Sequence, residues 1–199
     1  MQPRLRLRGA SLTNPLAPLR RAWREGPLAG VDEAGRGCLA GPVLAAAVVL
    51  RWPPPRLPGL ADSKRLCPRE RERLCNCIQE RALAFALGLA EAAEIDQLNV
   101  LQATYLAMRR AIARLPLPPN LVAVDGYPIH DLPLAQVAII DGDEKFAPIT
   151  AASILAKVWR DRLMLDYEQQ YPGYGFGVHK GYATPQHLQA LRALGPSPI

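Results

Sequence analysis

AGVDEAGRGCLAGPVLAAAVVL, residues 29–50, is the stretch from which the fold of this chain can be predicted. Two adjacent acids, Asp32 and Glu33, follow a short apolar lead-in and stand directly before Gly35-Arg36-Gly37. A run of small apolar residues with three β-branched valines follows, ending at Leu50. This pattern predicts a strand, a tight glycine turn and a second strand.

The two acids of this stretch call for a chemical explanation. Adjacent residues on a strand point to opposite faces, so Asp32 and Glu33 cannot both face the core. Burying either charge without a partner would be costly. A carboxylate at a strand end beside a glycine turn is a suitable ligand for a hard cation. The structural alternative is that the pair only opens a turn, because polar residues commonly mark turns.

Size and charge limit the possible functions. The chain has 199 residues, enough for one domain with a sizeable core, and 49% of them are hydrophobic. Lys and Arg number 24 and Asp and Glu 18, a net charge of +6 that suits a polyanionic partner without proving one. Acidic motifs inside a basic chain suggest metal-holding carboxylates surrounded by a surface that attracts phosphate.

Cysteine spacing and hydropathy indicate the compartment. The four cysteines form no C-x-x-C pair, which excludes a zinc ribbon and a thioredoxin motif. No signal peptide is visible, and the longest strongly apolar run, residues 39–50, is too short to span a bilayer. We therefore expect reduced thiols and a cytoplasmic protein.

The first 27 residues differ in composition from the rest. They are rich in Arg and Pro and contain a single acid, Glu25. We expect a mobile basic arm or a loosely packed lead-in. An organellar transit peptide would share this composition, but the amphipathic periodicity it needs is missing.

Further elements follow from periodicity, caps and prolines. Residues 83–90, 121–125 and 135–140 are apolar runs that predict strands. Helical spacing predicts helices over residues 68–82, 94–115 and 148–171. A last helix is predicted from Thr184 as N-cap, with Pro185 at the first helical position, to Leu194.

Acids stand at the ends of three predicted strands. Apolar strands separated by helices indicate a partly parallel sheet covered on both faces, and ligands of such sheets bind beyond the carboxyl ends of the strands. Four carboxylates converging there would repel one another unless a divalent metal neutralised them, and oxygen-only ligands favour Mg²⁺ or Mn²⁺ over zinc. The alternative is that each acid ends an ordinary turn. The four acids are Asp32, Glu33, Asp125 and Asp143.

At this point the chain resembles a known family. The motifs VDEAGRG, DSK, VDG, the GD of DGD, AASILAKVWRD and HKGY occur in the order found in ribonuclease HII, over about residues 28–198. The resemblance implies an α/β fold of the ribonuclease H type, a five-stranded mixed sheet flanked by helices with a C-terminal helical extension. It places one catalytic domain over residues 28–199, after a basic arm of residues 1–27.

The resemblance also implies an activity. It implies an endoribonuclease that hydrolyses the RNA strand of RNA–DNA hybrids and cuts at single ribonucleotides embedded in duplex DNA. Two Mn²⁺ or Mg²⁺ ions would serve the reaction, which leaves 5′-phosphate and 3′-hydroxyl ends. The partner would be an RNA–DNA hybrid or a ribonucleotide-containing duplex; we expect a monomer with no membrane association.

Particular residues match the family's motifs. The four strand-end acids, Asp32, Glu33, Asp125 and Asp143, match its metal-binding carboxylates. The family reads the RNA–DNA junction with a glycine-arginine-glycine turn and a tyrosine, and it contacts the nucleic-acid backbone near its DSK segment. The matching residues here are Gly35, Arg36, Gly37 and Tyr182 for the junction, and Ser63 and Lys64 for the backbone.

The chain departs from the family pattern at two places. Asp141 stands where the family often has Lys, which adds negative charge beside the predicted metal site. Family members usually continue with a basic His-Arg-Arg-Ser-Phe-like segment beyond the position of Pro198-Ile199. Any substrate contact made by such a tail therefore does not carry over from the resemblance.

Other residues favour structural roles. We expect Asp161 to be an ion-pair partner rather than a metal ligand. Lys157 is either a phosphate contact or a structural lysine, and His179 is expected to be an oriented loop histidine rather than a catalytic base. Trp23, Trp52 and Trp159 are expected to pack.

Two other function classes remain at this stage. One is another metal nuclease of the same fold, such as a junction resolvase, against which the Gly-Arg-Gly turn and Tyr182 argue. The other is an inert hybrid-binding module, which would be expected to lack a carboxylate, whereas all four matching acids are present.

Overall fold

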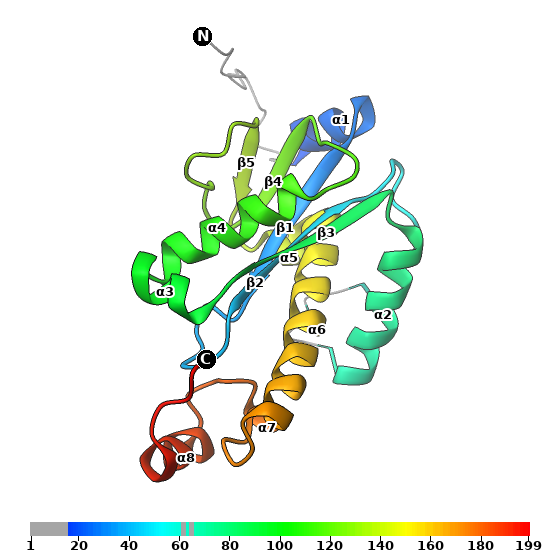
Figure 1. The fold of residues 1–199 in the computed structure, drawn as a ribbon. Coiled ribbons are helices and arrows are strands. Elements are labelled where there is room, and N and C mark those ends of the chain that lie inside the picture. Colours follow the sequence, from blue (N-terminus) through cyan, green and yellow to red (C-terminus); the bar gives the residue numbers. More distant parts are fainter. Residues whose placement is uncertain (1–15, 61–62, 64–65) are drawn as a thin grey trace.

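A five-stranded mixed sheet forms the centre of the molecule (Figure 1). The structure is a computed structural model that describes residues 16–60, 63 and 66–199. The strand order is β3-β2-β1-β4-β5, and β1 pairs in antiparallel fashion with β2 and in parallel with β4. This confirms the predicted fold class. The strands are β1 Leu28–Ala34, β2 Val43–Val49, β3 Ala84–Ala90, β4 Leu121–Asp125 and β5 Gln136–Ile139.

Helices cover both faces of the sheet and extend it at the C-terminal end (Figure 1). The helix α6 crosses one face and α4 the other, while α7 and α8 form the C-terminal helical extension. The helices are α1 Ala17–Glu25, α2 Pro68–Arg81, α3 Ala92–Leu98, α4 Val100–Ala113, α5 Gly142–Lys145, α6 Ala147–Gln170, α7 Phe176–His179 and α8 Pro185–Leu194.

Alternation along the strands divides the core into two layers. Leu28 of β1 packs on the α6 side of the sheet, whereas Ala29 and Val31 pack on the α4 side. The helix α6 approaches β1 closely at Gly30, where a Cβ atom would lie 2.1 Å from the Pro148 carbonyl carbon. The strand β1, which carries the first two acids, is therefore held directly against the helix that carries the AASILAKVWRD motif.

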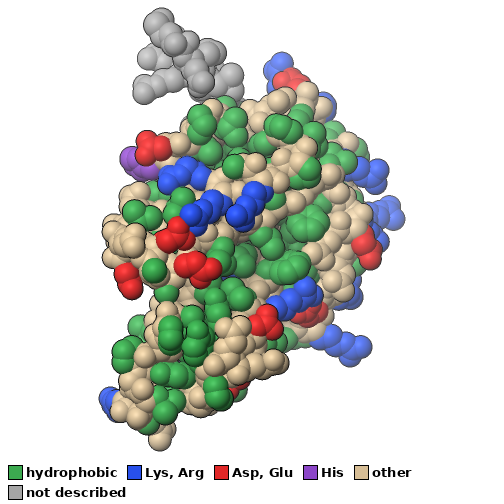
Figure 2. All heavy atoms as spheres, in the orientation of Figure 1, with side chains coloured by type: hydrophobic (Ala, Val, Ile, Leu, Met, Phe, Trp, Pro, Cys, Tyr) green, Lys and Arg blue, Asp and Glu red, His purple; other side chains and the backbone are tan. Residues whose placement is uncertain are grey.

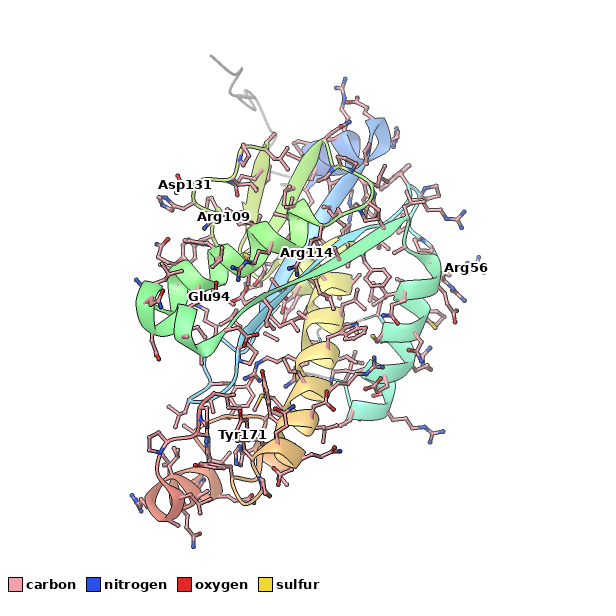
Figure 3. All side chains as sticks on the ribbon, in the orientation of Figure 1. Arg56, Glu94, Arg109, Arg114, Asp131 and Tyr171 are labelled. Atoms are coloured by element: carbon pink, nitrogen blue, oxygen red, sulfur yellow. The ribbon has the colours of Figure 1, made fainter. Side chains whose placement is uncertain are left out.

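Arginine side chains connect helices to backbone carbonyls around the sheet. Arg109 of α4 donates to the carbonyl oxygen of His130, and Arg114, which follows the helix, donates to that of Leu87 (Figure 3). Such bonds satisfy carbonyl groups in loops and at strand edges that the regular ladder leaves open. A buried arginine beside the candidate site, Arg160, also donates to backbone carbonyls.

The segment before residue 28 differs from the expected loosely packed lead-in. Residues 17–25 form α1, in which Leu19 and Trp23 are buried and the Trp23 indole donates to the Leu50 carbonyl. The prediction missed the helix because its Arg-rich face dominates the composition, while its few apolar residues face the core. Residues 1–15 lie outside the described part.

The helix predicted over residues 94–115 is two helices. Asn99, with a positive φ of 70°, ends α3 and caps α4 by accepting hydrogen bonds from the backbone N–H groups of Leu101 and Gln102. The apolar periodicity continues across this break, which is why the sequence pattern reads as one helix. The remaining predicted strands and helices form close to their expected bounds, including the Thr184 cap of α8.

The molecular surface carries charge of both signs. On the face shown in Figure 2, Lys and Arg side chains lie over several elements and are interspersed with acidic ones. On this face the Lys and Arg side chains of the described residues are therefore not gathered into one patch. None of the described helices is long and apolar enough to cross a membrane.

Candidate active site

Sheet topology brings the predicted acids to one edge. Val31 and Val124 are register partners on the parallel strands β1 and β4, so Asp32 and Asp125 follow at adjacent strand ends. Asp125 pairs with Ile139, the last residue of β5, and the chain then turns through Asp141-Gly142 to Asp143 in α5. We call Asp32, Glu33, Asp125 and Asp143 the carboxylate cluster.

Backbone amides orient the carboxylate of Asp125. Its Oδ1 accepts hydrogen bonds from the backbone N–H groups of Gly142 at 2.7 Å and Asp143 at 3.4 Å. A Cβ atom at Gly142 would lie 3.2 Å from that oxygen and 2.7 Å from the Ile149 side chain. Glycine is thus needed for the turn to close on Asp125, and this closure positions Asp143, which is buried, beside it.

The surroundings of Asp32 and Glu33 raise the pKa of both side chains. Burial raises the pKa of Asp32 well above its usual range, and the charges of Glu33 and Asp125 raise it further. Burial also raises the pKa of Glu33, a shift that Arg36 opposes and Asp125 reinforces. Burial and the nearby carboxylates therefore make the charged forms of Asp32 and Glu33 less favourable than they would be in water.

The donor set of the cluster fits a hard divalent cation. All four side chains offer carboxylate oxygens, and their mutual repulsion is the kind that a bound cation relieves. As they stand in the structure, no three His, Cys, Asp or Glu side chains within residues 16–60, 63 and 66–199 form a group that could hold a metal ion. Glu33 lies near Arg36, whose guanidinium is 3.8 Å from the Glu33 carboxylate.

A chain of hydroxyls links the cluster to the DSK segment. The hydroxyls of Ser63 and Ser153 lie 2.8 Å apart, and Ser153 of α6 also forms a hydrogen bond with Asp32. Ser63 is only 4% exposed, so its hydroxyl faces α6 rather than solvent. The predicted contact residue Ser63 therefore reaches the site through Ser153, while Lys64 lies outside the described residues.

Two loops meet beside the cluster, and we call them the loop pair: residues 35–42, between β1 and β2, and residues 180–182, after α7. The backbone N–H of Leu39 donates to the Gly181 carbonyl at 2.9 Å. The Cys38 thiol donates to the Lys180 carbonyl at 3.7 Å, and the Cys38 and Tyr182 side chains are close enough to affect each other's pKa. The structure thus brings Tyr182 next to the Gly-Arg-Gly turn, although Tyr182 and Gly37 are 145 positions apart in the sequence.

Tyr182 is presented from a well-supported loop. Its side chain is 40% exposed, and the Lys157 ammonium lies 5.4 Å from its ring centroid. Burial is the main cause that raises the pKa of its hydroxyl. The Tyr182 carbonyl meets His187 Nδ1 at 3.0 Å, and His187 stacks on His179 with 4.3 Å between ring centroids.

The weaker candidates have the structural roles expected of them. Asp161 pairs with Lys157 at 2.8 Å, and His179 accepts a hydrogen bond from the Gly181 N–H through Nδ1. Asp141, the departure from the family pattern, points outward and pairs with Lys145 at 3.2 Å. Its extra charge is thereby compensated on the surface.

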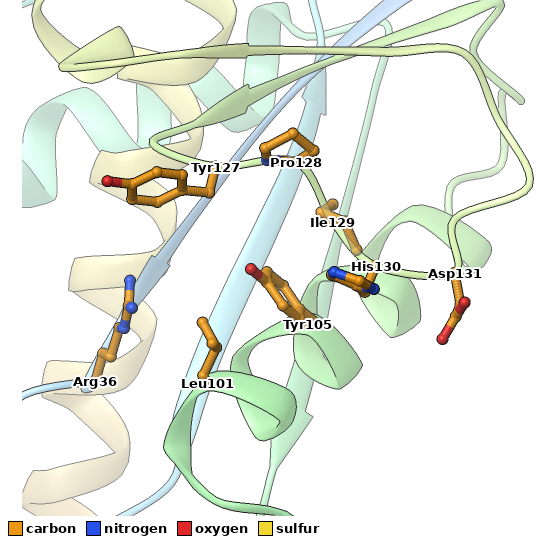
Figure 4. A pocket seen from close by; sticks show the side chains of 8 residues that line it. All are labelled: Arg36, Leu101, Tyr105, Tyr127, Pro128, Ile129, His130 and Asp131. Atoms are coloured by element: carbon orange, nitrogen blue, oxygen red, sulfur yellow. The ribbon is translucent and has the colours of Figure 1, made fainter.

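Two hollows are lined in part by residues of the loop pair. One, of about 520 Å³, runs between α2, α6 and residues 177–182, and Arg71, Lys157, Lys180 and Tyr182 are among the residues that line it. The other, of about 640 Å³, has Arg36 and Tyr127 on one side and His130 and Asp131 on the other (Figure 4). Arginine, lysine and tyrosine lining is typical of surfaces that take nucleic acid.

The sequence interpretation missed Ser153 and Arg160. Both are buried in α6 and reach toward the site. A signal for both was available: Ile149, Ser153, Ala156, Arg160 and Met164 recur at spacings of three and four and share one helix face. A serine and an arginine on an otherwise apolar buried face are exceptions that need polar partners.

Comparisons with known proteins agree with this geometry. Residues 29–198 match the family model described as Ribonuclease HII. The ribonuclease HII of Thermus thermophilus is 55% identical over 178 residues, 89% of this chain and 86% of that protein. That of Geobacter sulfurreducens is 53% identical over 180 residues, 90% of this chain and 82% of that protein.

A solved structure has the same architecture. The crystal structure of ribonuclease H2 from Pyrococcus horikoshii superposes with a TM-score of 0.72 at 26% sequence identity. The similarity covers 86% of this chain and 90% of that one. Both the sequence and the fold are therefore similar to those of type 2 ribonucleases H over nearly the whole chain.

Proposed function

Because this chain belongs to the ribonuclease HII family, whose members are metal-dependent endoribonucleases acting on RNA–DNA hybrids, we propose that it also cuts at single ribonucleotides in duplex DNA. The reaction is hydrolysis of the phosphodiester, leaving 5′-phosphate and 3′-hydroxyl ends. The observation that carries the proposal is the position of the loop pair, because Gly35-Arg36-Gly37 and Tyr182 meet beside the carboxylate cluster.

The carboxylate cluster is the proposed metal site. Asp32, Glu33, Asp125 and Asp143 would hold two Mg²⁺ or Mn²⁺ ions in the substrate complex. When bound, the ions supply an activated water and stabilise the leaving 3′ oxygen. The amides of Gly142 and Asp143 keep the Asp125 carboxylate in place for this task, and Ser153 does the same for Asp32.

The loop pair is the proposed reader of the 2′-hydroxyl. Only this hydroxyl separates RNA from DNA at one position of a duplex, so the reader needs backbone groups that approach the sugar closely. A Cβ atom at Gly37 would meet nothing within 4 Å, so the backbone there is open to an approaching strand. Tyr182 offers its ring to the neighbouring deoxyribose from the other loop.

The two hollows are the proposed path of the duplex. Lys157 and Lys180 on one side of the cluster, and Arg36 on the other, offer cations to phosphates of a strand that crosses the acids. Such contacts position a duplex without reading its sequence. This arrangement suits an enzyme whose specificity depends on a sugar rather than on bases.

A cleavage assay tests the proposal directly. A labelled duplex with one ribonucleotide, a continuous RNA–DNA hybrid and an all-DNA duplex are incubated with the protein in Mg²⁺, in Mn²⁺ and in chelator. We expect metal-dependent cuts in the first two substrates and none in the third, with 3′-hydroxyl ends that a DNA polymerase extends. If the protein cleaves the hybrid but leaves the single-ribonucleotide duplex intact, the proposed specificity is overturned while the activity of the family still holds.

A further inference from the structure

One fully buried arginine connects the two loops of the loop pair. Arg160 of α6 is 0% exposed, and its three guanidinium nitrogens each donate to a backbone carbonyl. Nε donates to Pro42 at 3.0 Å and Nη2 to Ala40 at 3.1 Å, both in the first loop. Nη1 donates to Lys180 at 2.9 Å in the second loop.

A planar guanidinium suits this task for a geometric reason. Its N–H groups lie in one plane at fixed angles, so three carbonyls that accept from it are fixed relative to one another. A lysine ammonium on a flexible stem cannot fix three acceptors in that way. Because the guanidinium is buried, losing any of these hydrogen bonds would cost free energy, since a carbonyl or a cation inside the protein would be left without a partner.

The glycines of both loops fit closely around Arg160. A Cβ atom at Gly35 would lie 2.2 Å from Nε of Arg160, and one at Gly181 would lie 2.2 Å from the Ala40 carbonyl oxygen. Both glycines have positive φ angles, of 101° and 84°. The loops are therefore packed against the guanidinium and against each other with no spare space between them.

We propose that Arg160 is a positioning residue for ribonucleotide recognition: it sets the distance between the Gly-Arg-Gly turn and Tyr182. The inference rests on the proposed function of these two elements. Arg160 does not touch the substrate, because it is enclosed by the loops. It acts through the backbone of residues 40–42 and 180, and so decides where the turn and the tyrosine ring stand before any substrate arrives.

Arg160→Lys is the primary test. The variant keeps the charge but loses the three-way fork, so we expect the ratio of kcat/KM on a single-ribonucleotide duplex to that on a continuous hybrid to fall about 10-fold. The same ratio is measured for Tyr182→Ala and for the double variant. If Arg160 acts through Tyr182, the double variant loses no more than Tyr182→Ala alone. The proposal would be overturned if the losses of the two single variants multiply in the double variant and follow the fall in melting temperature.

Gly181→Ala is the second test and leaves Arg160 in place. Its methyl group would press on the Ala40 carbonyl and force the two loops apart. We expect the same fall in the ratio, even if Arg160→Lys fails to fold. An unchanged ratio in folded Gly181→Ala protein would overturn the proposal.

Arg110→Lys is the matched control. Arg110 of α4 also has several acceptors, the Leu89 carbonyl and the Glu94 carboxylate, but lies on the opposite face of the sheet (Figure 3 labels Glu94). We expect its ratio to stay at the wild-type value. If Tyr182→Ala leaves the ratio unchanged, the proposed role of Tyr182 as a reader fails. If Tyr182→Ala lowers the ratio but Arg160→Lys and Gly181→Ala do not, only the proposed role of Arg160 fails.

Discussion

The carboxylate cluster and the loop pair are neighbours at the same end of β1, but opposite electrostatics build them. In the cluster, like charges crowd together, and burial and repulsion raise the pKa of Asp32 and Glu33. In the loop pair, three carbonyl oxygens converge on one buried cation, Arg160. In the first region the charged forms of Asp32 and Glu33 are disfavoured by their surroundings, whereas in the second the charge of Arg160 is met by three acceptors of the protein itself.

Under the proposed function, this difference separates two tasks of the enzyme. A region that binds a cation gains affinity when the cation relieves repulsion between carboxylates. A region that measures a sugar must hold its shape before binding, because each loosely held group would cost entropy when it is ordered. Substitutions in the cluster should therefore affect chemistry more than folding, and those in the loop pair should affect selectivity.

The largest effect is expected for Asp125→Asn. The amide is a weaker metal ligand and no longer offsets the metal charge, so cleavage of every substrate should fall by at least about 100-fold. The Asn oxygen can still accept from Gly142, so circular dichroism and the melting temperature without metal should stay near wild type. Asp96→Asn on the exposed surface of α3 is the control. Full activity of Asp125→Asn in Mg²⁺ would remove Asp125 from the metal site.

Tyr182→Ala should have a smaller and more selective effect. With 40% of the residue exposed, little packing is lost, so the melting temperature should change little. Cleavage at a single embedded ribonucleotide should fall about 10-fold or more, which corresponds to a loss of about 1.4 kcal/mol of transition-state stabilisation. Tyr182→Phe separates the contribution of the ring from that of the hydroxyl beside Cys38. A loss of activity that merely follows the loss of stability would make Tyr182 a packing residue.

Asp32→Asn tests the unfavourable charge of the cluster. The folded-state pKa of Asp32 is raised, so the metal-free folded chain binds a proton more readily than the unfolded chain. The contribution of Asp32 to the stability of the metal-free chain is therefore most favourable at or below the usual carboxyl pKa of about 4 and is lost as the pH rises through the raised value. Asn at this position should raise the melting temperature in chelator at neutral pH and flatten its dependence on pH.

The measurement for Asp32→Asn is thermal unfolding in chelator from about pH 5 to about pH 8. Asp166→Asn, on the exposed side of α6, serves as the control and should leave the pH dependence as it is. A lower melting temperature for Asp32→Asn at every pH would show that the carboxylate stabilises the metal-free fold. That result would contradict the statement that the charged form of Asp32 is disfavoured there.

The smallest effect is expected for Lys64→Ala. Lys64 lies outside the described residues, next to Ser63 in the DSK motif. If it contacts one phosphate, the slope of log binding constant against log salt should change by about one. Lys145→Ala, which removes a lysine paired with Asp141, should leave that slope unchanged. An unchanged slope in Lys64→Ala would show that this lysine touches no phosphate.

The sequence by itself determined most of the sheet and the positions of the acids. Alternating and continuous apolar runs predict β1 to β5, and acids at the ends of Leu28–Ala34 and Leu121–Asp125 predict their convergence. Caps such as Thr184 followed by Pro185 are equally local. These features could be predicted because each depends on residues within a few positions of one another.

Only the tertiary structure decided how the loop pair is held and which polar residues face inward. Arg160 meets the carbonyl of Ala40 across 120 positions, and Ser153 meets Ser63 across 90. The burial of Trp23 in α1 likewise involves a distant partner, because its indole donates to the Leu50 carbonyl. A sequence pattern records which side chains lie on one face of an element, but the acceptors of a buried donor belong to whichever loops the fold brings against that face.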